Sequence, residues 1–162
     1  MPDYGFAFQQ ATLSTSYKTA GVIGPSSGVA PLRRVRIFEF SVGQGTPNAT
    51  DSAIQWDMSR VTAWTTYAAS TGNPSPVDPA DTSAQALANQ NFSAEPAYAS
   101  ASAGLDIWNL TINQRAAYRW IAKDGKEIVI PAVTSGGVGF RALAATPSGY
   151  ASLGGGSAFF SE

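Results

Sequence analysis

The sequence predicts an all-β domain, a jelly-roll-like antiparallel sandwich of about eight short strands joined by long loops. Short runs rich in β-branched and aromatic residues recur along the chain, and glycine, proline and serine separate them. Almost no stretch has the spacing of an amphipathic helix. The length of 162 residues fits one domain. We therefore expect residues 13–162 to form the sandwich and residues 1–12 to form an N-terminal arm or an edge strand.

The charge content restricts the class of partner. Charged residues make up 13% of the chain, and the ten basic residues nearly balance the eleven acidic ones. This is about half the usual share of ~25%. A surface with so little charge favours association with copies of the chain or with a large partner, and it disfavours nucleic-acid binding, which needs a basic face. The alternative is a monomer whose surface is solvated by serine, threonine, asparagine and glutamine.

Cysteine and histidine are both absent. The chain therefore has no disulfide or thiolate metal site, and it lacks the most common general base near neutral pH. We expect no cofactor, no metal site and no enzymatic activity. One enzymatic alternative stays open, because any two of the dispersed carboxylates can meet in space and act as a glycosidase pair. These carboxylates are Asp51, Asp57, Asp78, Asp81, Asp106, Asp124 and Glu127.

Targeting signals are also missing. The first ten residues include an early aspartate and no apolar run of signal-peptide length. No segment approaches the ~20 apolar residues of a membrane span. We expect the protein to be made in the cytoplasm, to stay there until it joins an assembly, and to have no membrane partner.

The N-terminal residues alternate, with three aromatic side chains on one side. These are Tyr4, Phe6 and Phe8. Each offers ~150 to 250 Å² of apolar area, so we expect them to be buried, either on this domain or on a neighbouring molecule.

A short strand follows near Val22 and Ile23. Residues 24–28 match the hydrolase pattern G-x-S-x-G, but without a histidine they indicate a surface turn.

Residues 32–43 predict a strong strand. Its apolar residues change face between Ile37 and Phe38, which indicates a bulge or a strand that passes between two sheets. The densest basic cluster of the chain lies near its start and consists of Arg33, Arg34 and Arg36. This cluster fits an acidic partner surface, or else a solvated edge that discourages strand pairing.

In residues 54–59, apolar and polar side chains alternate, which predicts a half-buried strand with Asp57 and Ser59 among the polar positions. Residues 70–102 form the longest irregular stretch, and their prolines argue against continuous structure. A short helix is expected at 79–88, with Asp78 as its cap. The length of this stretch suggests a contact surface.

Residues 105–130 contain three successive strand candidates. The first, 105–112, has apolar residues on both faces, as expected for a strand buried on both sides. The segments 115–122 and 126–130 flank Asp124-Gly125, a dipeptide that favours hairpin turns, so they are expected to pair. Two last strands are expected at 138–143 and within 157–162.

Two blocks, 32–62 and 110–143, resemble a group of tailed-bacteriophage virion proteins. The matching residues are RVRIFEF at 34–40, DSAIQW at 51–56, LTINQRAAYRW at 110–120, EIVIPA at 127–132 and GVGFR at 137–141. The resemblance implies a jelly-roll protein that decorates or cements phage capsids as a homotrimer, bound to the major capsid protein in the virion. The expected contact residues are the three N-terminal aromatics and the arginine cluster, namely Tyr4, Phe6, Phe8, Arg33, Arg34 and Arg36.

A second function stays open, a tail or fibre-associated module that binds a host-surface glycan. Four aromatic residues in or near loops are candidate stacking platforms: Trp64, Tyr67, Tyr98 and Tyr150. Ordinary packing under long loops is the alternative explanation for these side chains.

Overall fold

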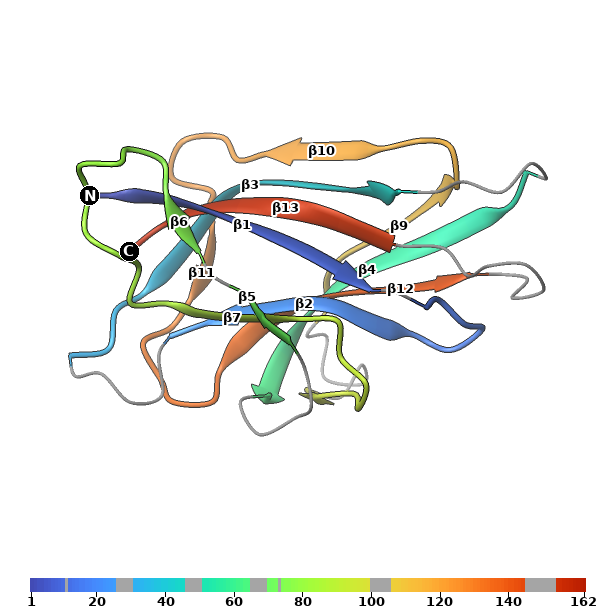
Figure 1. Cartoon of the computed structure of the whole chain (residues 1–162), viewed down its shortest axis with the longest axis horizontal. Coiled ribbons are helices and arrows are strands. Elements are labelled where there is room, and N and C mark those ends of the chain that lie inside the picture. Colours follow the sequence, from blue (N-terminus) through green and yellow to red (C-terminus); the bar gives the residue numbers. More distant parts are fainter. Residues whose placement is uncertain are drawn as a thin grey trace.

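The computed structural model describes residues 1–10, 12–25, 31–45, 51–64, 70–72, 74–99, 106–144 and 154–162. These residues form thirteen strands in two antiparallel sheets and contain no helix. The two sheets face each other as the layers of a sandwich, and the two chain ends lie at the same end of it (Figure 1). The predicted all-β fold is confirmed.

Eight strands form the body of the sandwich. Sheet A contains, in order, β1 (Asp3–Gln10), β13 (Gly154–Ser161), β3 (Val35–Gln44) and β10 (Tyr118–Ile121). Sheet B contains β2 (Lys18–Gly24), β12 (Gly137–Ala144), β4 (Ala53–Ala63) and β9 (Asp106–Asn113). Successive strands alternate between the two sheets: β1 and β3 lie in sheet A and β2 and β4 in sheet B. The same alternation holds later in the chain, with β9 and β12 in sheet B and β10 and β13 in sheet A. This order is the jelly-roll connection of two four-stranded sheets.

Five short strands extend these sheets. In sheet A, β6 (Ser75–Pro76) pairs with β1, and β11 (Ile128–Ile130) pairs with β3. In sheet B, β7 (Leu87–Gln90) pairs with β2, β5 (Ser70–Gly72) with β7, and β8 (Ala97–Tyr98) with β4. The stretch 70–102, which was expected to be irregular, therefore supplies four of these five strands.

Strand β1 is part of the domain's own core. It pairs with β13 along its whole length, from Asp3 opposite Ser161 to Gln10 opposite Gly154. Its three aromatic side chains are at most 3% exposed, and these are Tyr4, Phe6 and Phe8. Of the two alternatives for these rings, burial on this domain is confirmed. The alternative of an arm that orders on a partner is wrong, because burying the rings between the sheets already removes them from water.

The change of face predicted in β3 is confirmed as a bulge. Glu39 lies opposite Phe159, but the next pair is Ile37 with Phe160, so Phe38 is the extra residue. Two strand residues opposed to one partner reverse the alternation. As a result, residues on both sides of the bulge contribute to the core.

The predicted hairpin is wrong. Gly125 does adopt a positive φ of 74° in a turn, but β10 and β11 do not pair with each other. Both pair with β3, from Tyr118 opposite Val42 to Ile130 opposite Val35. Strand β3 is long enough to pair with both segments, one after the other. The turn between them leaves the sheet and interrupts this edge of sheet A.

Two further expectations are corrected. No helix forms at 79–88: the Asp78 carboxylate accepts the Ala80 N–H at 2.9 Å and its carbonyl accepts the Asp81 N–H at 3.0 Å, which closes a turn. The chain then continues into β7, whose pairing with β2 outweighs the helix propensity of the alanines. Strand β9 is half-buried instead of buried on both sides, because it lies at an edge of sheet B.

Candidate functional site

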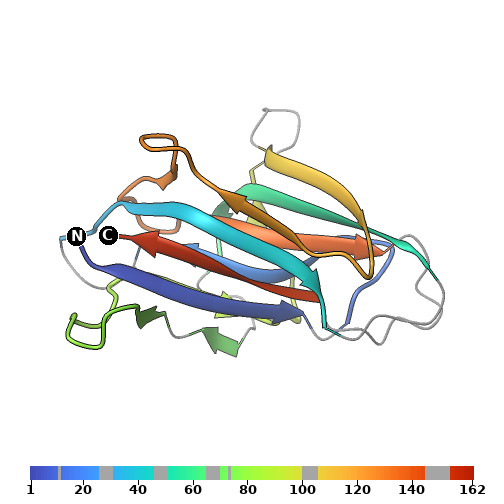
Figure 2. The same ribbon diagram turned by 90° about the horizontal axis from the view of Figure 1, so that it is seen from above.

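The outward face of sheet A is covered mainly by small side chains. Figure 2 looks onto this face from above. Residues beside the buried Phe40 and Val42 point away from the core, since successive strand residues alternate. Read across β3, β13 and β1, the outward residues are Glu39, Phe159 and Gly5, then Ser41, Ser157 and Ala7, then Gly43, Gly155 and Gln9. We call these nine residues the open face.

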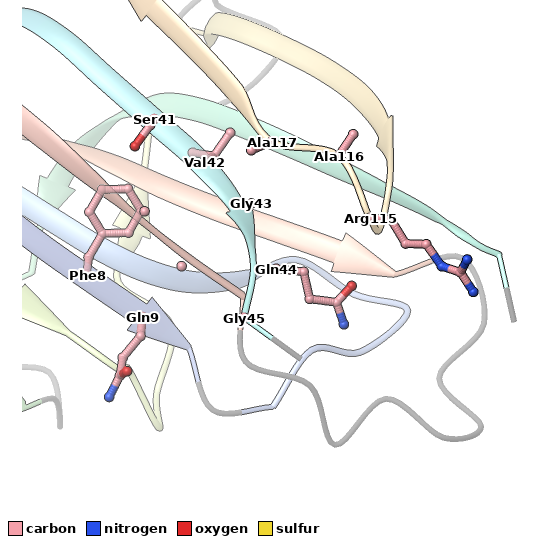
Figure 3. Close-up of a pocket in the computed structure, with 12 residues that line it drawn as sticks. Phe8, Gln9, Ser41, Val42, Gly43, Gln44, Gly45, Arg115, Ala116 and Ala117 are labelled. Atoms are coloured by element: carbon pink, nitrogen blue, oxygen red, sulfur yellow. The ribbon is translucent and has the colours of Figure 1, made fainter. Parts of the chain in front are cut away.

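A groove of about 420 Å³ lies at one end of the open face. The ends of β1 and β3, the start of β13 and the turn at 115–117 line it (Figure 3). Gly43 and Gly155 lie in it without side chains, and Ala117 lies beside Gly43. The Arg115 side chain extends away from the groove in Figure 3. Small residues therefore form much of the lining of the groove.

The open face has little net charge. Arg119 of β10 donates two hydrogen bonds to Glu39, at 2.6 and 2.9 Å, and these bonds hold the pKa of the Glu39 carboxyl below its usual value. At the groove, Arg115 pairs with Asp51 at 3.3 Å. Ser41 and Ser157 share a hydroxyl hydrogen bond of 2.9 Å in the middle of the face. The face therefore presents neutral hydrogen-bonding groups flanked by paired charges.

The outward side of sheet B is different, because it holds a buried carboxylate, Asp57, paired with a mostly buried arginine, Arg141. Arg141 of β12 donates to Asp57 of β4 at 2.5 Å, and the Asp57 side chain is only 1% exposed. The guanidinium lies between two tyrosine rings, 4.5 Å from the centre of Tyr17 and 4.3 Å from that of Tyr98. Cation–π contacts of this kind stabilise a cation that has lost part of its water. Residues 54–59 were predicted to form a strand with one side buried and one exposed. In the structure the polar side of this strand is covered as well, and Asp57 and Ser59 are buried.

The segment leading to β8 forms part of this cover. The Tyr98 hydroxyl lies 2.7 Å from the Thr19 hydroxyl, which in turn donates to the Glu95 carboxylate at 2.5 Å. A Cβ atom at Gly139 would collide with the Tyr98 ring, so a glycine at that position lets the ring lie directly on β12. Burial is the main cause that raises the pKa of Tyr98. These contacts indicate a structural role for the cluster.

The structure does bring two candidate catalytic carboxylates together. The Ser59 hydroxyl lies 2.6 Å from Asp57 Oδ2 and 2.9 Å from Asp106 Oδ1. In glycosidases, both carboxylates must face the sugar. Here Asp57 Oδ2 is also bonded to Arg141, and the residue is buried. This arrangement leaves Asp57 no path to a substrate.

The residues expected to contact a partner are dispersed. Tyr4, Phe6 and Phe8 are in the core, so they offer no surface to a partner. Arg33 and Arg34 are exposed just before β3, and Arg36 is half-buried within it. The expectation that the arginines meet a partner stays a prediction.

Two of the four aromatic residues considered as glycan platforms lie in the described part of the chain, and both already pack within the protein. Trp64 is 1% exposed, and Tyr98 packs on Arg141. Tyr67, Tyr150 and most of the 24–28 motif lie outside the described residues.

Sequence reasoning missed both the open face and the Arg141 cluster. A signal for the first was present, since Ser41 and Gly43 alternate with Phe40 and Val42 in β3. The second depends on which strands are neighbours, which the sequence pattern does not specify.

Comparison with known proteins gives no further assignment. No family model, no curated protein and no solved structure matches the chain. Over the described ranges, no group of three or more acidic residues is placed to hold a metal ion. The same residues contain no helix long and apolar enough to cross a membrane.

Proposed function

We propose that the protein is a structural component of a bacteriophage virion, a capsid decoration or cement protein that stabilises the head by protein–protein contacts. The observation that carries this proposal is the open face of sheet A. The resemblance of residues 32–62 and 110–143 to phage virion proteins supports it from the sequence.

The open face suits contact with another protein. Small side chains let a partner's backbone approach closely, and serine and glutamine supply hydrogen bonds. Few charges have to lose water when such a surface is covered. An apolar contact is available at one border, where Ile121 of β10 is 58% exposed.

The alternative functions have less support. Glycan binding through stacking loses Trp64, which is buried, and Tyr98, which covers Arg141. Catalysis by a carboxylate pair would need Asp57 to reach a substrate. Cementing requires a folded domain with a surface that a partner can cover, and the open face is a candidate for such a surface.

In this proposal, the partners are the major capsid protein and other copies of the chain, with threefold association on the shell. The proposed place of action is the virion, after synthesis in the host cytoplasm. Neither nucleic acid nor a membrane takes part in the proposed contact.

Two matched substitutions test the proposal. Ala7 lies on the open face, and Ala94 lies in the segment that covers sheet B; both are exposed. Ala7→Arg places a charge in the proposed contact, so it should weaken binding to capsids assembled without this protein by tenfold or more, which is about 1.4 kcal/mol. Ala94→Arg should bind normally. Occupancy is measured by titrating each purified protein onto such capsids and quantifying the bound fraction.

The unfolding transition of both variants should match that of the parent protein, which separates binding from folding. Normal binding by Ala7→Arg would contradict the open face as the contact. Loss of binding only in Ala94→Arg would move the contact to sheet B. Failure of the unsubstituted protein to bind such capsids would contradict the decoration function itself.

A further inference from the structure

Each sheet of the sandwich has two edges, and three of the four are protected against pairing with another strand. An unprotected edge strand exposes a row of N–H and C=O groups that can pair with another chain. The edge of sheet A at β6 has only two residues, one of them Pro76. The edge of sheet B at β5 has only three residues. Short strands and proline are known ways to prevent edge pairing.

The third edge, formed by β10 and β11, is interrupted. The excursion between the two strands contains two exposed lysines, Lys123 and Lys126. Pro131 follows directly after β11. Lysine, proline and a broken strand each discourage pairing.

The fourth edge is shared by β9 and the two-residue β8, which both pair with β4. Strand β9 itself is neither short nor interrupted by lysine or proline. It runs for eight residues with the sequence DIWNLTIN, without proline, lysine or arginine. Its one charged residue, Asp106, lies 2.9 Å from the Ser59 hydroxyl and 3.9 Å from Arg141, so its charge is directed to the cluster on sheet B. Among the described residues, β9 pairs only with β4.

The register shows which backbone groups point outward. The Gln114 N–H donates to the Ser52 carbonyl at 2.9 Å, next to the pair of Asn113 with Ala53. In an antiparallel ladder, hydrogen-bonded pairs alternate with non-bonded pairs. Trp108, Leu110 and Ile112 therefore bond to β4, and the regular alternation ends at the register shift between the Met58 and Ser59 pairs. Asn109 and Thr111 direct their N–H and C=O groups toward the open edge.

We propose that β9 pairs with β9 of a second copy of this chain, antiparallel, about a twofold axis at Leu110. Asn109 of one copy then lies opposite Thr111 of the other. These two residue pairs form backbone hydrogen bonds, and sheet B continues across the two copies. This contact goes beyond the proposed decoration function and uses a different surface from the open face.

A second copy is the occupant that the side chains favour. About this axis, Leu110 faces itself and Trp108 faces Ile112, while the polar Asn109 faces the polar Thr111. No charged residue lies between Asp106 and Asn113, so two copies meet without like-charge repulsion. An isologous contact needs a self-complementary surface of this kind.

The apolar side of β9 also gains cover. Trp108 and Ile112 pack against the core but stay half-buried, and Trp108 stacks on Tyr118 of β10 at 5.2 Å. These rings lie where the two sheets meet at their β9 and β10 edges. A second copy along β9 would exclude water from this partly exposed apolar group.

The test compares Thr111→Lys with Thr82→Lys. Both threonines are exposed, but Thr82 lies outside every strand. Sedimentation equilibrium of the purified full chain should show a dimer for the parent protein and for Thr82→Lys. Thr111→Lys should raise the dissociation constant at least tenfold, because it brings two charges together near the axis and does not touch the bond to β4.

A second variant separates pairing from side-chain effects. Thr111→Pro removes one outward N–H, and an edge strand tolerates proline at such a position. In the parent protein, the amide hydrogens of Asn109 and Thr111 should exchange slowly when the protein is concentrated and quickly when it is dilute. In Thr111→Pro, the Asn109 amide should exchange quickly at both concentrations.

Three results would overturn the proposal: a parent protein that is monomeric at every concentration, a dimer that both Thr111 variants leave intact, or an equal effect of Thr82→Lys. A monomeric parent protein whose capsid binding is lost in Thr111→Lys would assign the edge to a strand of the shell instead.

Discussion

The two outward faces of the sandwich have the same backbone architecture and opposite chemistry. On sheet A, the residues facing outward across β3 and β13 are mainly serine and glycine, and the face is open in the described structure. On sheet B, the corresponding positions hold Arg141 and Asp57, which are covered by tyrosines. The alternation of a strand identifies the face turned from the core, but it does not tell whether that face meets water.

The difference in chemistry between the two faces indicates that they have different roles. A buried charge that loses its partner is strongly destabilising, so the cluster on sheet B is sensitive to substitutions that remove one member of the Arg141–Asp57 pair. Small neutral residues on sheet A are not needed to hold the two sheets together. We therefore assign stability to the covered face and partner contact to the open face, and the following predictions test that division.

The largest effect is expected from deleting residues 1–10. The deletion removes the strand between β13 and β6 together with three core aromatics. Truncating one buried aromatic costs about 3–5 kcal/mol, and a domain's total stability is about 5–15 kcal/mol. The deleted protein should therefore show no cooperative unfolding by circular dichroism.

Removing only Met1 and Pro2 is the control and should leave folding unchanged, because Met1 is 83% exposed. If the protein without residues 1–10 instead folds normally and loses only capsid binding, β1 is an arm and sheet A does not need it.

Arg141→Met is expected to destabilise the fold by about 3–5 kcal/mol, because it leaves the Asp57 carboxylate buried without its cation. Urea unfolding measures the change. The double variant Asp57→Leu with Arg141→Met should recover most of the loss, since no buried carboxylate is then left without its cation. An Arg141→Met protein as stable as the parent would show that the cluster on sheet B does not support the fold.

A smaller effect is expected in alkaline solution. Burial raises the pKa of Tyr98 and, to a lesser extent, that of Tyr17, so the folded state favours their protonated phenols. The stability that these protonated phenols contribute is complete below about pH 10, which is the pKa of tyrosine in the unfolded chain. It falls as the pH rises above that value, by at most about 1.4 kcal/mol per pH unit for each group.

Urea unfolding at pH 8 and pH 11 tests this dependence. Tyr98→Phe should show a smaller decrease in stability between the two values than the parent protein. An identical decrease would mean that Tyr98 ionises as easily in the folded state as in the unfolded chain.

The smallest effect is expected from Arg119→Met on sheet A. Its ion pair with Glu39 is well formed, but the arginine side chain is 62% exposed. Exposed pairs contribute little to stability, so urea unfolding should barely change, in contrast to Arg141→Met. A loss as large as that of Arg141→Met would remove the distinction between the two faces.

Local patterns predicted the strands well. The alternation in β4 and the change of face at Phe38 could be seen in the sequence, because each depends on neighbouring residues. The Asp124-Gly125 turn was also recognised, but not its role, because turn chemistry does not specify which strand the flanking segments choose as partner.

The candidate sites depended on long-range neighbours. Asp57 and Arg141 are far apart in the sequence and meet only because β4 and β12 are adjacent. The N-terminal aromatics were assigned to a partner because the sequence does not reveal that β1 has a place beside β13. The long strands were therefore predictable, whereas the four short strands between Ser70 and Tyr98 and the order of the strands were not.

Hydroxyl-radical footprinting of the free protein and of the capsid-bound protein tests the division between the two faces most directly. Phe159 lies on the open face, Tyr17 lies on the covered side of sheet B, and both are partly exposed. We expect capsid binding to protect Phe159 from oxidation and to leave Tyr17 unchanged. Protection of Tyr17 without protection of Phe159 would contradict the assignment of partner contact to sheet A.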